Sequence, residues 1–116
     1  MPRPPSEDLI RTLRPGLQLT ARRLVSRCAA AGLPVKVISG LRTFEEQEAL
    51  FLQHHTPLRG GQSKHNFGKA FDLWPLKKMK YSTEEWTRIG KIAKNIGLRW
   101  GGDFKWRDYG HCELPG

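Results

Sequence analysis

The sequence predicts an α+β fold in which helices pack on a small, mainly antiparallel sheet. Two capping boxes and two stripes of apolar residues at helical spacing predict the helices. Short runs of β-branched and aromatic residues, bounded by Gly and Pro, predict strands joined by turns. The length of 116 residues, of which 38% are hydrophobic, suits one compact domain over residues 1–116 with a buried core.

The first third of the chain predicts two helices and a strand. Ser6 can cap a short helix that reaches Leu13, and Pro15 closes this helix. A second helix ends where Gly32 supplies the expected C-terminal glycine. Its apolar stripe consists of Leu17, Ala21, Leu24, Val25 and Cys28. Residues 35–39, with the sequence VKVIS, predict a short buried strand.

The middle of the chain predicts a helix, a polar loop and a second strand. Thr43 and Glu46 form a capping box that opens the helix. Its successive turns carry Gln47, Leu50 and Phe51. Residues 55–66 are polar and contain paired glycines, so we expect a loop. Residues 69–74 alternate in the manner of a strand, which Pro75 ends.

The last part of the chain predicts one more helix and further short strands. Ser82 and Glu85 form the second capping box, and Gly97 ends the helix that follows. The apolar stripe of this helix consists of Trp86, Ile89, Ala93 and Ile96. Residues 98–100 and 106–114 suit short strands joined by turns.

The chain is strongly basic, with 20 Lys and Arg against 11 Asp and Glu, a formal net charge of +9 and a pI of about 10.1. Such a charge favours an anionic partner: nucleic acid, membrane headgroups, or the acidic polymers and lipids of a bacterial envelope. The basic residues are spread along the chain, and no dense basic run resembles a nucleic-acid-binding arm.

Cysteine usage and the N-terminus bear on the cellular compartment. Cys28 and Cys112 lack the spacing of a metal finger, and the sequence leaves a bridge between them open. Cys28 falls on an apolar helical stripe, which favours a buried free thiol. The Pro-rich start has no apolar signal-peptide core, and no apolar run is long enough to cross a bilayer. We expect synthesis in the cytoplasm without a signal peptide.

The histidines differ in their surroundings. His54 and His55 lie at the end of a predicted helix, where a cation is favourable, and we interpret both as solvated. His65 instead precedes Asp72, a carboxylate in the middle of an otherwise apolar strand. Burial of a carboxylate without a partner is costly, and a metal ion would offset that cost. A His and an Asp seven residues apart do not by themselves define a metal site.

His111 offers a further ligand near the C-terminus. Asp108 precedes it by three residues, so a single turn can direct both side chains to one place. Two His and one Asp suit Zn²⁺ with one position left open for water. Asp108 is then a spare carboxylate where hydrolysis needs a general base. The alternative is that Asp108 only orients a histidine ring.

These residues form the pattern Ser63-x-His65-x-x-Gly68-x-Ala70-x-Asp72 followed by Asp108-x-x-His111. The pattern resembles the signature of the D-alanyl-D-alanine carboxypeptidase and L-alanyl-D-glutamate endopeptidase family. Members of that family are zinc peptidases that share a metal site with lysostaphin and the hedgehog signalling domain. The resemblance spans residues 37–114 and includes the segments 39–43 (SGLRT) and 100–104 (WGGDF). Segment 100–104 and segment 108–111 (DYGH) resemble the ending of phage endolysins of the family, which usually have proline at the position of Gly110.

The resemblance implies a role for each matching residue. His65, Asp72 and His111 would hold one Zn²⁺, in a domain of the same fold as these peptidases. Asp108 would be the general base that accepts the proton of the attacking water, and Arg42 would stabilise the oxyanion of the tetrahedral intermediate. Considered alone, Arg42 is a surface residue ahead of a helix cap.

Four further residues have less definite roles. Ser63 is expected to hydrogen-bond within the site, and Glu113 to act as an outer partner of a ligand. Trp106 and Tyr109 either line the substrate cleft or pack in the core.

The sequence therefore predicts a zinc peptidase that hydrolyses the stem peptides of peptidoglycan, most consistent with an L-alanyl-D-glutamate endopeptidase. A D-alanyl-D-alanine carboxypeptidase or dipeptidase is the alternative, because it shares the same metal ligands. A non-catalytic zinc-stabilised binding module would not need Asp108. A nucleic-acid binder would leave Asp72 unexplained and lacks a recognition motif.

The expected setting is that of a phage endolysin, because neither a signal peptide nor a wall-binding module is evident. Such an enzyme is made in the host cytoplasm and acts in the periplasm or cell wall after release, here as a monomer. Its net charge of +9 would concentrate it at anionic envelope surfaces.

Overall fold

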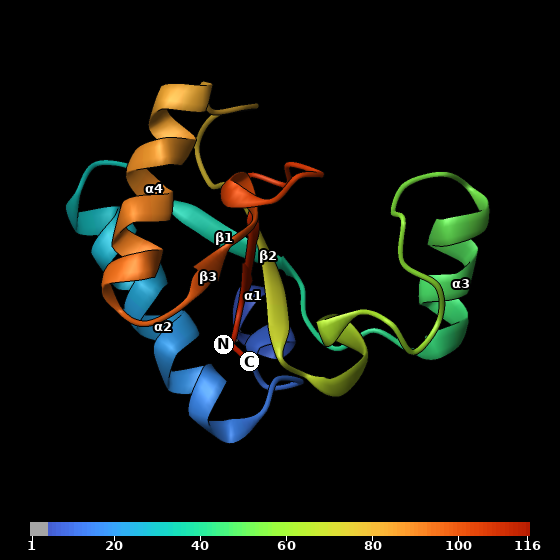
Figure 1. The fold of residues 1–116 in the computed structure, drawn as a ribbon. Coiled ribbons are helices and arrows are strands. Elements are labelled where there is room, and N and C mark those ends of the chain that lie inside the picture. Colours follow the sequence, from blue (N-terminus) through green and yellow to red (C-terminus); the bar gives the residue numbers. More distant parts are fainter. Residues whose placement is uncertain (1–4) are drawn as a thin grey trace.

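The computed structural model describes residues 5–116, which form a four-stranded sheet in the order β1-β2-β4-β3 (Figure 1). Every pair of neighbouring strands is antiparallel. The strands are β1 (Val35–Ser39), β2 (Ala70–Pro75), β3 (Arg99–Trp100) and β4 (His111–Glu113). The helices are α1 (Pro5–Ile10), α2 (Pro15–Ala30), α3 (Phe44–Leu52) and α4 (Thr83–Asn95), with 3₁₀ turns η1 (Lys64–Phe67) and η2 (Gly101–Asp103). The predicted α+β class is confirmed.

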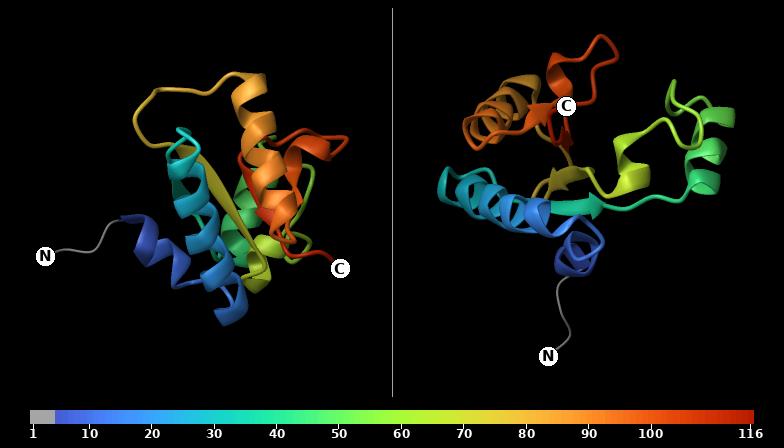
Figure 2. Two further views of the ribbon diagram at one scale, coloured as in Figure 1. Left: turned by 90° about the vertical axis from the view of Figure 1, so that its left-hand side faces the viewer. Right: turned by 60° about the horizontal axis from the view of Figure 1, so that its bottom comes forward.

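The helices lie on different sides of the sheet. Figures 1 and 2 show α2 and α4 side by side against one face, whereas α3 stands apart on the opposite side. The core lies between the sheet and these two helices, and its fully buried large side chains include Leu17, Leu24, Phe71, Leu73 and Ile89. Burial of each such side chain contributes about 1.5–3 kcal/mol. The core thus fixes β2, while the opposite face of β2 is left for the site.

The first helix differs from the prediction. It ends at Ile10 rather than Leu13, and Ser6 lies inside it instead of capping it. The Ser6 hydroxyl accepts a hydrogen bond of 2.6 Å from the backbone N–H of Val37. Val37 belongs to β1, an edge strand, and an edge-strand N–H needs a partner from outside the sheet. Tertiary contact therefore decides the role of Ser6. Pro15 does not close α1, which already ends at Ile10, but opens α2.

Both predicted capping boxes are present. The Thr43 hydroxyl accepts from the N–H of Glu46, and the Ser82 hydroxyl accepts from the N–H of Glu85. The predicted apolar stripe of α4 is buried at Trp86, Ile89 and Ala93. In α4 the close approach of the Trp100 ring leaves no room for a side chain at Gly90.

Helix α3 is attached in an unusual way. Gln47 is its buried residue, whereas Leu50 and Phe51 are half-buried and Leu52 is exposed. The helix and the loop after it, residues 43–62, project from the sheet, and we call them the arm (Figure 2). The predicted loop over residues 55–66 differs at its end, where η1 forms. The arm is therefore not held by an apolar stripe.

The C-terminal segment is less regular than predicted. Of residues 106–114, the strand β4 takes up only His111–Glu113. The backbone N–H of Asp108 bonds to the carbonyl of Gly101 at 2.9 Å, which folds residues 104–110 into a loop above the sheet. Cys28 and Cys112 are both free and buried, as expected for Cys28, and burial raises the pKa of the Cys28 thiol to about 11. None of the helices among residues 5–116 is long and apolar enough to cross a membrane.

Candidate metal centre

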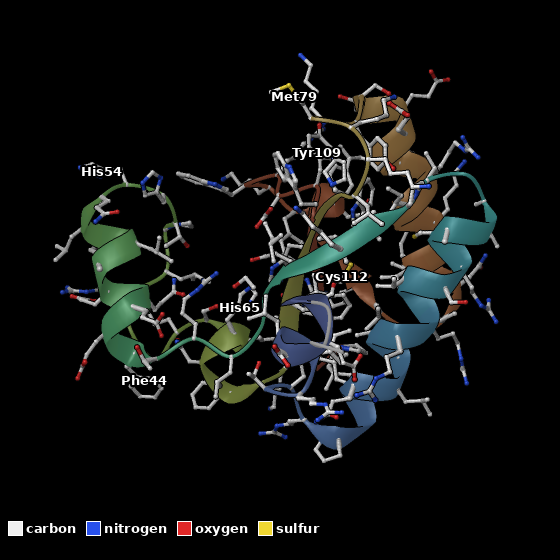
Figure 3. All side chains as sticks on the ribbon, turned by 180° about the vertical axis from the view of Figure 1, so that it is seen from behind. Phe44, His54, His65, Met79, Tyr109 and Cys112 are labelled. Carbon is white, nitrogen blue, oxygen red and sulfur yellow. The ribbon has the colours of Figure 1, made fainter. Side chains whose placement is uncertain are left out.

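Three of the predicted site residues meet at one point of the sheet. One ligand atom from each of His65, Asp72 and His111 lies within 4.8 Å of the other two, an arrangement that could hold a metal ion. The residues come from η1, β2 and β4, so three separate elements build the cluster. Both histidines are buried, and the Asp72 side chain is 18% exposed. Figure 3 shows His65 where η1 meets the sheet, on the side that faces the arm.

The ring of His65 is held in one orientation. Ser63 and Asn66 form a capping box around η1, in which the Ser63 hydroxyl accepts from the N–H of His65. The ring Nδ1–H donates to the carbonyl oxygen of Gly40 at 2.9 Å, because a carbonyl can only accept. Nε2 is then left facing the carboxylate of Asp72 at 3.2 Å. A Cβ at Gly40 would lie 2.6 Å from the carbonyl oxygen of Leu9, so the close approach of the Gly40 backbone to Leu9 requires glycine.

The ring of His111 is held from the other side. Its Nε2–H donates to Oε1 of Glu113 at 2.8 Å, which leaves Nδ1 facing Oδ1 of Asp72 at 3.2 Å. Glu113 is fixed in turn, because its Oε2 lies 3.0 Å from the ammonium of Lys64 and 3.1 Å from the guanidinium of Arg99. Glu113 thus occupies the position expected of an outer partner to a ligand.

The close contacts among Asp72, His111 and Glu113 shift the pKa values of all three side chains. Burial alone would raise the pKa of Asp72, but hydrogen bonds from His111 and His65 hold it well below its usual range. Burial alone would lower the pKa of His111, but the carboxylates of Asp72 and Glu113 raise it to about 9. The pKa of Glu113 falls to about 2, because His111 and Lys64 outweigh the effect of burial. The cluster thus stabilises a positive charge among its ligand atoms.

The hydrogen bonds of the two histidine rings show that His65, Asp72 and His111 are suited to bind a metal ion. Both outer ring nitrogens donate to fixed acceptors, so the inner nitrogens can present lone pairs to the same point as the Asp72 carboxylate. Converging acceptors repel one another unless a cation lies between them. Two imidazoles held by outer partners and one carboxylate match an open metal site with three protein ligands.

Arg42 lies beside this cluster. Its Nη2 is 3.4 Å from Oδ2 of Asp72 and 3.2 Å from the hydroxyl of Ser39, and its Nη1 donates to Oε1 of Gln47 at 2.7 Å. Its side chain is 17% exposed, so Arg42 is not the surface residue that its position before a helix cap indicates. Thr43, next in the chain, caps α3, so the start of the arm places Arg42 at the site.

Asp108 lies at the open side of the cluster. Its Oδ2 is 4.0 Å from Nδ1 of His111, and its side chain is 56% exposed. Desolvation in the cleft and the negative charge of Asp72 raise the pKa of Asp108 above the usual value. A carboxylate with a raised pKa, open to solvent and beside a candidate metal position, is suited to accept a proton.

The cluster forms the floor of a cleft of about 540 Å³ between the arm and the C-terminal loop. The walls consist of Leu50, His55, Thr56, Pro57, Leu58 and Gln62 on the arm, and of Phe104 and Trp106 on the loop. His55 lines the cleft and is exposed, in agreement with its interpretation as a solvated residue. His54 lies at the far end of the arm from His65 (Figure 3). Trp106 lines the cleft and is 58% exposed, whereas Tyr109 packs against the core.

Three contributors to the site were not foreseen from the sequence: Gln47, the backbone carbonyl of Gly40, and Asn66. The Asn66 side chain donates to the carbonyls of Arg42 and Thr43 and accepts from the N–H groups of Gly61 and Ser63. It thereby joins both ends of the arm. The sequence contains no pattern that predicts such roles for a single polar side chain or for a backbone carbonyl in a turn.

Comparisons with known proteins agree with this geometry. The model of the D-alanyl-D-alanine carboxypeptidase family matches residues 58–114, which include the three clustered residues and Asp108. The chain is 34% identical to the peptidoglycan L-alanyl-D-glutamate endopeptidase CwlK of Bacillus subtilis, over 88% of this chain and 73% of that protein.

Solved structures agree as well. The L-Ala D-Glu endopeptidase ChiX of Serratia marcescens is 25% identical and superposes with a TM-score of 0.71 over 95% of this chain and 86% of that one. A mutant of the vancomycin resistance D,D-pentapeptidase VanY, solved in complex with Zn(II), shares the fold with a TM-score of 0.69 at 16% identity, over 90% of this chain and 73% of that one. Fold and sequence identity lead to one conclusion, which confirms the resemblance seen in the sequence: the chain belongs to the D-alanyl-D-alanine carboxypeptidase family and is a peptidase.

Proposed function

We propose that residues 1–116 are a single zinc metallopeptidase domain that hydrolyses the stem peptides of peptidoglycan, as an L-alanyl-D-glutamate endopeptidase. His65, Asp72 and His111 would hold the zinc. The observation that carries the proposal is the convergence of their ligand atoms at the floor of a cleft large enough for a peptide. The 34% identity to an enzyme named for this activity supports the choice of substrate.

In the proposed reaction, different residues of this chain bind the peptide, transfer the proton and stabilise the oxyanion. Bound zinc supplies Lewis acidity, which polarises a carbonyl and lowers the pKa of water. Asp108 accepts the proton of the attacking water and then donates it to the leaving amine. Arg42 directs its guanidinium at the oxyanion that develops on the scissile carbonyl. The walls of the cleft bind and orient the peptide.

The charges in the cleft favour an endopeptidase over a carboxypeptidase. A carboxypeptidase needs a cation that is available for the terminal carboxylate of its substrate. The Lys and Arg that line the cleft are Arg42 and Lys64. Arg42 points its Nη2 toward Asp72 and is assigned to the oxyanion of the scissile carbonyl, so it does not also bind a terminal carboxylate. Lys64 contacts Glu113 and the carbonyl of Leu114.

The setting we propose is that of a phage endolysin, made in the host cytoplasm and active in the cell wall after release. The formal net charge of +9 would hold the enzyme near the anionic polymers and lipids of the envelope. This setting rests on analogy with the family members that the sequence resembles.

The proposal is tested by digestion of purified peptidoglycan with the zinc-loaded protein, followed by mass spectrometry of the products. Cleavage between L-Ala and D-Glu leaves L-Ala on the glycan and releases peptides that begin with D-Glu. Release of free D-Ala alone would instead establish the carboxypeptidase alternative. An absence of products from the zinc-loaded protein would favour the non-catalytic binding module. A chelator should abolish cleavage, and added zinc should restore it.

A further inference from the structure

Gln47 is a polar residue buried where an apolar one is expected. It is 0% exposed, and within α3 it is the residue that the structure buries. A buried amide is stable only when both its oxygen and its nitrogen are hydrogen-bonded. The partners of Gln47 therefore show what its burial achieves.

Those partners lie on two sides of the cleft floor. The amide oxygen accepts a hydrogen bond of 2.7 Å from Nη1 of Arg42. The amide nitrogen donates a hydrogen bond of 2.8 Å to the carbonyl oxygen of Leu58, a residue of the cleft wall. A guanidinium can only donate and a carbonyl can only accept, so these partners fix which way the amide points.

The contact to Gln47 restricts Arg42 at one end of its guanidinium plane. With Nη1 held by Gln47, Nη2 is directed at Ser39 and Asp72, toward the metal centre. Arg has a long flexible side chain, but its guanidinium is a planar fork, so one strong contact at one nitrogen sets the direction of the other. Gln47 does not line the cleft and cannot touch a substrate bound there.

We infer that Gln47 is a positioning residue: it aims the guanidinium of Arg42 at the reacting carbonyl. The inference rests on the proposed function, because it assigns Gln47 an effect only through the role of Arg42 in catalysis. The bond to Leu58 has a second consequence, since it ties the direction of Arg42 to the wall against which the peptide binds.

The test is a double-mutant cycle of Gln47→Met and Arg42→Ala, with peptidoglycan cleavage as the assay. Methionine has a similar size and no hydrogen-bonding amide. Gln47→Met should lower kcat by roughly 10- to 100-fold with little change in KM, because a displaced catalytic group costs rate more than binding. In the Arg42→Ala background the same change should alter kcat by less than about 2-fold, because the pair acts as one unit.

A second variant, Gln47→Glu, separates the two hydrogen bonds of Gln47. Its carboxylate still accepts from Arg42, but it has no N–H for the carbonyl of Leu58. Gln47→Glu should restore most of the kcat that Gln47→Met loses. If Gln47 only held the cleft wall, Gln47→Glu would be as impaired as Gln47→Met, and KM would rise in both. If Gln47→Met does not fold, Gln47→Glu is compared with the wild-type protein: a kcat close to wild type supports the inference, and a loss of roughly 10-fold or more in kcat together with a raised KM overturns it.

A matched control is Gln18→Met on α2, which removes side-chain hydrogen bonds to the carbonyls of Leu13 and Arg11 away from the cleft. It should leave kcat unchanged. Equal losses from Gln47→Met with and without Arg42 would overturn the inference while the proposed function stands. A wild-type protein that does not cleave peptidoglycan would overturn the proposed function itself.

Discussion

Asp72 and His111 occupy directly paired positions on the antiparallel strands β2 and β4, with Oδ1 of Asp72 3.2 Å from Nδ1 of His111. Directly opposite residues of an antiparallel pair project to the same face of the sheet. The strand register itself therefore brings these residues together, although 39 positions separate them in the sequence. A slip of one residue would move one of the two side chains to the core face.

The first prediction concerns metal content. The wild-type protein should bind one zinc per chain, measured by elemental analysis after dialysis. His111→Gln should lose stoichiometric zinc, because only two of the proposed ligands remain. The matched control is His54→Asn, far from the cluster on the arm. Asparagine readily adopts the positive φ of 63° at this position, so the control should keep its zinc.

The second prediction concerns Arg42. Arg42→Ala should lower kcat on wall peptides by roughly 10²–10³, because it removes a cation aimed at the oxyanion. It should also lower the free energy of unfolding by about 1–3 kcal/mol, because the buried Gln47 oxygen loses its donor. Zinc content should stay the same. Wild-type turnover in this variant would mean that Arg42 has only a structural role.

The third prediction separates catalysis from metal binding. Asp108→Asn keeps the shape of the side chain and removes the proton acceptor, so cleavage should fall by roughly 10²–10⁴ while zinc remains bound. If Asp108 only oriented a ligand, zinc affinity would fall by roughly 10- to 100-fold and activity would recover at high zinc. Activity at saturating zinc distinguishes the two. The control, Asp103→Asn, changes an exposed aspartate that pairs with Lys94 and should remain fully active.

The fourth prediction concerns the loop that carries Asp108. A Cβ at Gly101 would lie 2.8 Å from Cβ of His111 and closer still to the carbonyl oxygen of Asp108. Gly101→Ala should therefore lower the free energy of unfolding by about 1–3 kcal/mol and reduce cleavage by moving both residues. Denaturant unfolding and the cleavage assay measure these effects. Gly16→Ala, with no atom within 4 Å of its new Cβ, should leave stability unchanged or slightly higher.

The local structure was largely predictable because it depends on neighbours in the chain. The capping boxes at Thr43 and Ser82 and the apolar stripe of α4 satisfy backbone groups and bury surface within one helix. The same holds for the strand at residues 35–39, whose bounds agree with β1. The predicted N-terminal cap at Ser6 was wrong, because the Ser6 hydroxyl instead accepts a hydrogen bond from Val37, which lies in a strand 31 residues further along the chain.

The identity of the clustered residues was also present in the sequence. Asp72 stood out as a carboxylate in an apolar strand, and the spacing of His65, Asp72, Asp108 and His111 carried the resemblance to the family. What the sequence could not supply was the distances between them. Those depend on the register between β2 and β4 and on the capping of η1 by Ser63.

The tertiary structure alone decided how the ligands and the cation are held. The carbonyl of Gly40 orients His65, Glu113 orients His111, and Gln47 directs Arg42. None of these contacts follows a helical or strand period, because each joins groups from elements or turns that only the packed fold brings together. The sequence by itself determined which side chains can bind a metal and move a proton. The fold determined which nitrogen or oxygen of each side chain faces the metal position and in which direction that side chain points. The reason is that the partners supplied by packing decide which atoms donate and which accept hydrogen bonds.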